Sequence, residues 1–235
     1  MNLGLSAKRL TLALTLSVIL LTGLSLAGNL ARLTLGLPRM EALNLNRLAL
    51  LLDVDQEANL PTWYSTMTLF IASSLLSLIG LIHRIRRERL AAHWLGLALI
   101  VSVLSFDELA GLHEWLNSLL KRFGRFEGPW FYPWVIVGGV VTLLFVGIYM
   151  RFFLQLPPRL QPQFALAAGL YIGGALGLEI VGGLIMSQGA GSALYFILET
   201  TTEELLEMVG VLLLIRALIQ YLTAMRPSVH IGFEA

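Results

Sequence analysis

The stretch YFILETTTEELLEMVGVLLLIRALIQYL, residues 195–222, decides the fold class of this chain. It is longer than the roughly 20 mostly apolar residues that an α-helix needs to cross a bilayer. Its first half nevertheless carries Glu199, Glu203, Glu204 and Glu207. Ionisable side chains are rare within membrane helices and tend to mark functional sites there. This stretch therefore predicts a membrane protein and the position of a polar site.

Five more segments have a similar composition. The chain of 235 residues is 57% apolar and 13% charged, whereas soluble domains carry about 25% charged residues. We predict spans over residues 10–28, 63–83, 91–116, 131–153, 164–186 and 195–222. Residues 1–28 also resemble a signal peptide, because two basic residues precede an apolar run; we interpret them as the first span. The expected fold is an all-α integral membrane bundle in a single domain, 1–235.

The basic residues predict the orientation, because Lys and Arg are enriched in cytoplasmic loops. We expect a bacterial inner membrane with both termini on its cytoplasmic side. In this orientation ten of the 16 Lys and Arg residues lie on the cytoplasmic side. The longest connection, 29–62, then lies outside. Its leucine-rich middle, 43–52, predicts a short helix in the membrane interface.

Every acidic residue except Glu88 and Glu234 falls in the outer half of this topology. In one continuous helix over 91–116, Asp107 and Glu114 share a face and lie about 10 Å apart along the axis. Carboxylates from three helices at a similar depth are typical of metal sites in helical bundles. The predicted ligands are Asp107, Glu108, His113, Glu114, Glu179, Glu203 and Glu207.

Two further readings of these acids stay open. Oxygen-rich ligation favours Fe, Mn or Ca, and the single histidine also leaves Zn possible. Alternatively, the basic residues Arg122 and Arg125 pair with the glutamates.

The segment 53–59 alternates oxygen-bearing side chains, as a solvated acidic turn or a calcium loop would, although the glycine and distal glutamate of an EF-hand are missing. If this segment folds over the outer mouth, it covers the cluster.

The sequence identifies no reaction. There is no P-loop, nucleophile elbow or dinucleotide fingerprint, and the absence of cysteine excludes disulfides and thiolate sites. A net charge of +1 gives no reason to expect nucleic acid. We expect a cation-binding or metal-binding membrane protein. The alternatives are an accessory subunit of a larger membrane complex and, third, a proton-coupled transporter with Asp107, Glu179, Glu203 and Glu207 as its relay.

Gly169, Gly173 and Gly177 recur at four-residue spacing in the fifth span. This spacing lets membrane helices approach closely. It predicts tight packing inside the bundle, with a dimer interface as the alternative.

Two motifs resemble segments of uncharacterised bacterial polytopic membrane proteins. They are D-x-E-x-N-x-P-T-W-Y-S, beginning at Asp55, and D-E-x4-H-E, beginning at Asp107. The resemblance implies a multi-pass membrane fold in contact with the lipid bilayer and no assigned activity. Asp55, Glu57 and Asn59 also resemble the acidic calcium segment of alkaline ceramidases. The His-x-x-x-His pair of that superfamily is absent here, and one span fewer is predicted.

Overall fold

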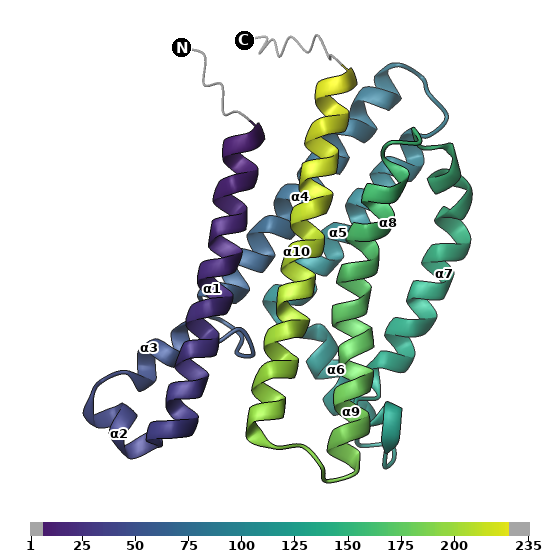
Figure 1. The fold of residues 1–235 in the computed structure, drawn as a ribbon. Coiled ribbons are helices and arrows are strands. Elements are labelled where there is room, and N and C mark those ends of the chain that lie inside the picture. The colour runs from purple at the N-terminus through teal and green to yellow at the C-terminus, as the bar shows by residue number, and fades with distance from the viewer. Residues whose placement is uncertain (1–6, 226–235) are drawn as a thin grey trace, which may run out of the picture.

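The computed structural model describes residues 7–225, and within this range it contains helices and no β-strand. Six helical segments are long and apolar enough to cross a membrane. They are Lys8–Leu35, Leu60–Ile85, Ala91–Ala110, Trp134–Gln155, Gln161–Ser187 and Ala193–Met225. The expectation of an all-α membrane bundle is therefore confirmed. Both ends of the described chain lie at the same end of the bundle (Figure 1).

Twelve elements follow one another along this part of the chain. The long helices are α1 (Ala7–Leu35), α4 (Leu60–Ile85), α5 (Ala91–Ala110), α7 (Trp134–Gln155) and α10 (Ala193–Met225). The fifth span is composite: α8 (Gln161–Ile172), the π-helical segment η2 (Gly173–Leu178) and α9 (Glu179–Ser187). The short elements are α2 (Leu37–Ala42), α3 (Asn46–Leu51), α6 (Leu112–Leu120) and the 3₁₀ turn η1 (Gly128–Trp130). The helix predicted within 43–52 corresponds to α3.

Helix α10 lies in the centre of the bundle, between α1 and α8, and α4 packs along α5 behind it (Figure 1). Glycines let the fifth and sixth spans approach closely. A Cβ atom added at Gly174 would lie 2.8 Å from the carbonyl oxygen of Glu203, and one added at Gly210 would lie 2.8 Å from that of Ala167. Neither position can carry a larger side chain without moving a backbone.

The glycine stripe that was expected to make this contact does not make it. A Cβ atom on Gly169, Gly173 or Gly177 would meet no atom within 4 Å in the described structure. The prediction of tight packing through these three glycines is therefore wrong. The glycines of this span that pack against α10 are Gly174 and Gly182, so the four-residue stripe lies on a different face of the helix.

Two predicted spans end elsewhere. Helix α1 continues to Leu35, which places Asn29 and Arg32 on the helix rather than in the connection. The third span ends at Ala110, because Gly111 adopts a left-handed conformation with φ of 58° and α6 begins after it. The expectation that Asp107 and Glu114 share one face of a continuous helix is therefore wrong.

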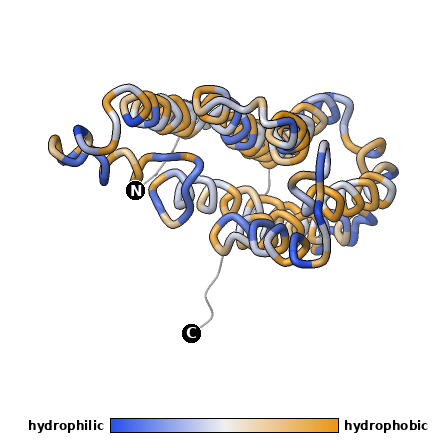
Figure 2. Tube along the Cα trace, turned by 90° about the horizontal axis from the view of Figure 1, so that it is seen from below, coloured by the Kyte–Doolittle hydropathy of each residue, from blue (hydrophilic) through white to orange (hydrophobic). Residues whose placement is uncertain are grey.

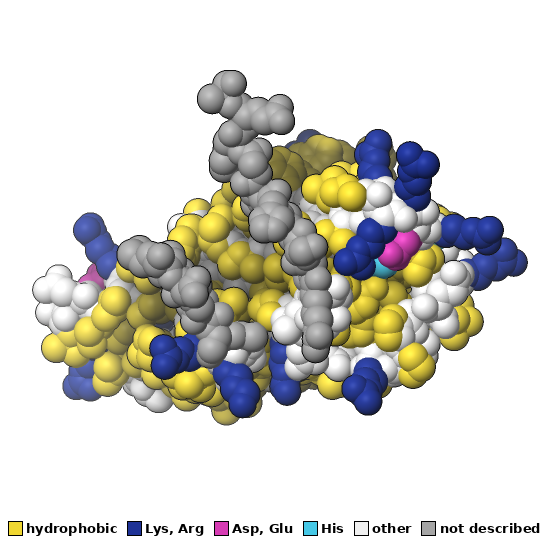
Figure 3. All heavy atoms as spheres, turned by 90° about the horizontal axis from the view of Figure 1, so that it is seen from above, with side chains coloured by type: hydrophobic (Ala, Val, Ile, Leu, Met, Phe, Trp, Pro, Cys, Tyr) yellow, Lys and Arg dark blue, Asp and Glu magenta, His cyan; other side chains and the backbone are white. Residues whose placement is uncertain are grey.

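The main apolar core lies toward the end where Ala7 and Met225 lie. There Trp94 is fully buried and stacks on His83 and Tyr221, while Phe152 and Phe164 meet it edge-on. Seen from this side, Lys and Arg side chains lie around the rim (Figure 3). We call this the basic end of the bundle, and the opposite end the acidic end.

Apolar residues dominate the helices when the bundle is viewed along its length (Figure 2). Many of them face outward, as a lipid environment requires. Leu143 on α7 is 74% exposed and Ile148 is 66% exposed. Helix α7 lies at the edge of the bundle and contacts α6 and η2.

Candidate functional site

Carboxyl groups from five segments meet at the acidic end. They come from the connection before α4, from α5, α6 and α9, and from the first turns of α10. Glu203 lies close enough to other glutamates for their charges to repel one another: Glu179, Glu199, Glu204 and Glu207. The structure thus brings all seven predicted site residues to one end of the bundle: Asp107, Glu108, His113, Glu114, Glu179, Glu203 and Glu207.

Asp107 is held by the chain reversal at Gly111. Its Oδ1 accepts a hydrogen bond from the backbone N–H of His113 at 2.9 Å, which caps the start of α6. Its Oδ2 lies 3.1 Å from Nδ1 of the same histidine. The short break between α5 and α6 therefore orients both an aspartate and an imidazole toward the cluster.

His113 is the basic group among these acids. Burial opposes its protonation, but the hydrogen bond to Asp107 and the negative charges of Asp107 and Glu114 outweigh this effect and raise the pKa of His113 to about 9. The imidazole is consequently a cation at neutral pH. It balances one carboxylate and leaves the others in excess.

Trp134 connects His113 to the fifth span. The two rings lie 5.1 Å apart at an angle of 51°. Glu179, the first residue after the π-helical segment, lies beside the indole of Trp134 and beside the carboxyl group of Glu203. Glu207, one turn further along α10, neighbours Glu108 and His113. The acids therefore form one continuous group from α5 to α10.

The connection before α4 covers part of this group. The carboxyl oxygens of Glu57 come within 2.5 and 2.6 Å of the point where a Cβ atom on Gly111 would lie. Burial and the charge of Glu114 raise the pKa of Glu57. Glycine is therefore required at position 111 for two reasons: the backbone there is left-handed, and the Glu57 carboxyl group occupies the space where a Cβ atom would lie.

Most oxygen atoms of the segment 53–59 are used within the fold. Asp53 is 2% exposed and accepts a hydrogen bond from Asn29 at 2.6 Å, and its other oxygen pairs with Arg32 at 3.5 Å. Asn59 caps α4 by accepting from the backbone of Thr62 at 3.1 Å. These contacts give Asp53 and Asn59 structural roles within the fold.

Asp55 and Glu57 are less well paired than Asp53 and Asn59, and Asp55 faces the start of α10. The Asp55 side chain is exposed, and its partner is Gln56 at a hydrogen-bond distance of 3.5 Å. Partial loss of hydration among the neighbouring segments and the charge of Asp53 raise the pKa of Asp55 to about 6. Asp55 is therefore mostly ionised at neutral pH, next to the charges of Glu114 and Glu179.

Lys and Arg side chains make no ion pair with the carboxylates of the cluster within residues 7–225. The ion pairs there join Arg32 to Asp53, His83 to Glu88 and His113 to Asp107. Arg122 and Arg125, the expected partners of the glutamates on α10, make no such pair within residues 7–225. Lys121 lies instead 5.0 Å from the ring centre of Phe131 and 4.9 Å from that of Tyr132.

The side chains in this arrangement do not enclose a metal ion. Among the described residues, no group of three or more His, Asp and Glu side chains is placed so that it could hold one. The carboxyl groups share a region rather than a single coordination centre. Binding of a metal would require some of them to change rotamer.

The comparisons with known proteins place the chain in a family. The profile of a domain of unknown function, DUF8692, matches residues 10–221. The chain belongs to the DUF8692 family. The match covers all six spans nearly completely, so both the acidic and the basic end fall within the DUF8692 domain. No curated protein and no solved structure matches the chain.

Sequence reasoning left out several residues that the structure adds to the cluster. Asp55 and Glu57 reach it from the connection before α4, and the only signal was the possibility that this segment folds over the mouth. Trp134 belongs to the cluster as well, because it contacts both His113 and Glu179. Its position one residue after a proline, at the start of a span, does not indicate such a role.

Proposed function

We propose that the protein binds a cation at the acidic end of the bundle, from the aqueous side next to it. The observation that carries the proposal is the convergence of Glu108, Glu179, Glu203 and Glu207 without a Lys or Arg partner in residues 7–225. Buried carboxylates that repel one another are stabilised by protons or by bound cations. A cation that enters such a group gains from several of them at once.

A divalent metal is the first candidate for this cation. Carboxylate oxygens suit Ca²⁺ and Mn²⁺ and can also hold Fe²⁺, whereas a single imidazole makes a weaker set for Zn²⁺. Glu203 and Glu207 lie one turn apart on α10, and Glu179 faces Glu203 from α9. Rotation of these flexible side chains toward one point would supply the oxygen ligands that the present arrangement holds apart.

The test is equilibrium dialysis of the purified protein against Ca²⁺, Mn²⁺, Fe²⁺ and Zn²⁺, followed by elemental analysis. We expect one of these ions to bind in stoichiometric amount and to raise the melting temperature, because a ligand that binds only the folded state stabilises it. Glu203→Gln keeps the shape of the side chain and should weaken binding about tenfold or more, which corresponds to about 1.4 kcal/mol. Glu127→Gln, an exposed acid in a connection, is the matched control.

If none of the four ions binds or stabilises the wild-type protein, the metal-binding proposal is wrong. If an ion binds equally to wild type and Glu203→Gln, the site lies elsewhere. In either case proton uptake by the cluster should be measured next, by potentiometric titration of both proteins.

A second function, as an accessory subunit of a membrane complex, is favoured by the outward face of the fifth span. Gly169, Gly173 and Gly177 leave open space around their backbones, and small residues on a membrane helix suit contact with another helix. Cysteine substitution at Gly173 and cross-linking in native membranes would test this. A product of higher mass is expected, whereas the monomer alone would contradict a partner at this face.

The third function, a proton-coupled transporter, has less support. The aromatic rings around Trp94 fill the basic end, where the acidic residue Glu88 is paired with His83. A relay across the membrane would need further ionisable groups between this pair and the cluster.

A further inference from the structure

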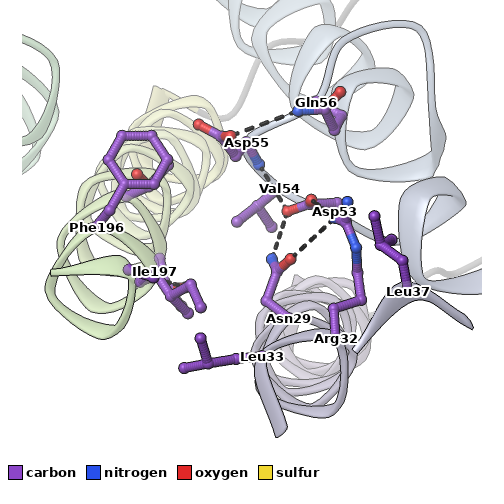
Figure 4. Close-up of a pocket in the computed structure, with 13 residues that line it drawn as sticks. Asn29, Arg32, Leu33, Leu37, Asp53, Val54, Asp55, Gln56, Phe196 and Ile197 are labelled. Carbon is purple, nitrogen blue, oxygen red and sulfur yellow. Dashed lines mark hydrogen bonds and ion pairs between the residues drawn. The ribbon is translucent and has the colours of Figure 1, made fainter. Parts of the chain in front are cut away.

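A cavity of about 400 Å³ lies beside the carboxylate cluster, between the end of α1, the segment 53–56 and the start of α10 (Figure 4). Ligand-binding clefts usually range from about 300 to 1,000 Å³. The four glutamates proposed to bind a metal do not line this cavity. Its walls come from α1, from the segment 53–56 and from residues 193–201 of α10. It is therefore a separate candidate site.

The ends of the first and sixth spans line the cavity, so the lengths of these spans indicate its depth in a membrane. The first membrane span ends at Leu35 and the sixth begins at Ala193, so the cavity is lined by the last turns of one and the first turns of the other. The 28 residues of the first span extend about 42 Å as a helix, beyond a hydrocarbon core of about 30 Å. The terminal turns of α1 and α10 thus project into the headgroup region.

One basic and two acidic side chains line the cavity: Arg32, Asp53 and Asp55. Within the described chain, both contacts of the Arg32 guanidinium, to Asn29 and to Asp53, are made by Nη1, so Nη2 remains for another acceptor. Asp53 is buried and has its own partners, whereas the Asp55 carboxylate has only the distant amide of Gln56. A ligand with one anionic and one cationic group would pair with Arg32 and Asp55 together.

Part of the remaining wall is apolar, and some of its side chains are exposed. Leu33 is 45% exposed and Leu37 is 52% exposed, and Phe196 and Ile197 line the opposite side on α10 (Figure 4). Exposed apolar side chains next to a charged pair suit a molecule with a polar head and a hydrocarbon tail. Membrane lipids are such molecules, and they are present at this depth.

We propose that this cavity binds an aminophospholipid, with its phosphate on Arg32, its primary ammonium group on Asp55 and an acyl chain along Leu33 and Ile197. Only the primary ammonium group can donate hydrogen bonds to Asp55. A choline headgroup has the same charge and no such donor, and a glycerol headgroup has no positive charge. The cavity therefore selects phosphatidylethanolamine over phosphatidylcholine and phosphatidylglycerol. None of the four glutamates named for the cation site takes part in this selection.

The experiment is native mass spectrometry of the full-length protein, released from detergent with equimolar mixtures of two of these lipids. We expect phosphatidylethanolamine to be retained about tenfold more than phosphatidylglycerol, the ratio for one charged contact of about 1.4 kcal/mol. Asp55→Asn should abolish this preference. Glu41→Gln, which removes an exposed acid on α2 outside the cavity, should keep it.

Two further variants distinguish the possible causes of a loss of lipid binding. Ala193→Trp adds a large side chain at the exposed wall of the cavity without changing a charge, and it should reduce retention of all three lipids. Glu203→Gln should bind lipid as the wild type does, even if it has lost its cation. This variant distinguishes failure of the lipid site from failure of the cation site.

Three results would overturn the proposal. One is equal retention of phosphatidylethanolamine and phosphatidylglycerol by the wild type, and another is an unchanged preference in Asp55→Asn. The third is competition by water-soluble glycerophosphoethanolamine that is as strong as competition by the intact lipid. That result would mean that the cavity binds a free headgroup compound rather than a lipid.

Discussion

The two ends of the bundle each contain a histidine that is paired with an acid and lies against a tryptophan. At the basic end His83 pairs with Glu88, lies 5.8 Å from Trp94 and is 4% exposed. At the acidic end His113 pairs with Asp107 and lies 5.1 Å from Trp134, and 33% of its side chain is exposed. The same residue types therefore occur in a closed environment and in an open one.

The surroundings of the two histidines explain the difference. His83 is enclosed by aromatic rings, and its Nε2 lies 3.0 Å from the hydroxyl oxygen of Tyr221. His113 is surrounded by carboxyl groups that cannot pack against one another as rings do. The basic end contributes packing energy and the acidic end contributes unmatched charge. We therefore expect mutations at the first to affect stability and mutations at the second to affect binding.

The largest effect should come from Trp94→Ala. Removing a fully buried aromatic side chain from a packed core costs about 3–5 kcal/mol. Trp115→Ala at the acidic end, where the side chain is 63% exposed, should change stability by less than about 0.5 kcal/mol. Thermal unfolding in one detergent would measure both. Equal losses would show that the two ends are packed alike and would remove the basis of the comparison.

A smaller loss, of about 2 kcal/mol, is expected for Gly111→Ala at the acidic end. The left-handed backbone contributes about 1–2 kcal/mol of this, and the added methyl group also displaces Glu57. The double variant with Glu57→Ala should recover only the second part. Gly139→Ala, on α7 with open space around it, is the control. A Gly111→Ala protein as stable as wild type would mean that the turn between α5 and α6 is not fixed.

The smallest effect should be the pH dependence of His113→Gln, about 1 kcal/mol, because solvent screens an ion pair whose side chains are 33% and 26% exposed. Because the pKa of His113 is raised from 6.5 to about 9, its pairing with Asp107 stabilises the folded state fully below pH 6.5. This contribution is lost as the pH rises toward 9. The melting temperatures of wild type and His113→Gln should therefore converge between pH 6.5 and 9. A difference that stays constant over this range would contradict a charged imidazole.

The helices and the acidic end could be predicted from the sequence because hydropathy and charge are local properties of each segment. The break at Gly111 could not, because a glycine between Ala110 and Leu112, two residues common in helices, fits a continuous helix as well as a turn. The deciding contacts come from Asp107, which caps the next helix, and from Glu57, which is distant in sequence. The pairing of Arg32 with Asp53 was missed for a related reason. It depends on α1 continuing past its apolar run, through residues that resemble a connection.

The π-helical segment Gly173–Leu178 sets the register of everything after it in the fifth span. Such a wide turn accommodates one residue more than an α-helix would, and one residue corresponds to about 100° of rotation. Glu179 therefore points toward Trp134 and Glu203, whereas an unbroken helix would turn it toward a neighbouring direction. Deletion of one glycine from this segment would hardly change the length or the mean hydropathy of the span. It would nevertheless turn the one carboxylate of the span, Glu179, out of the cluster.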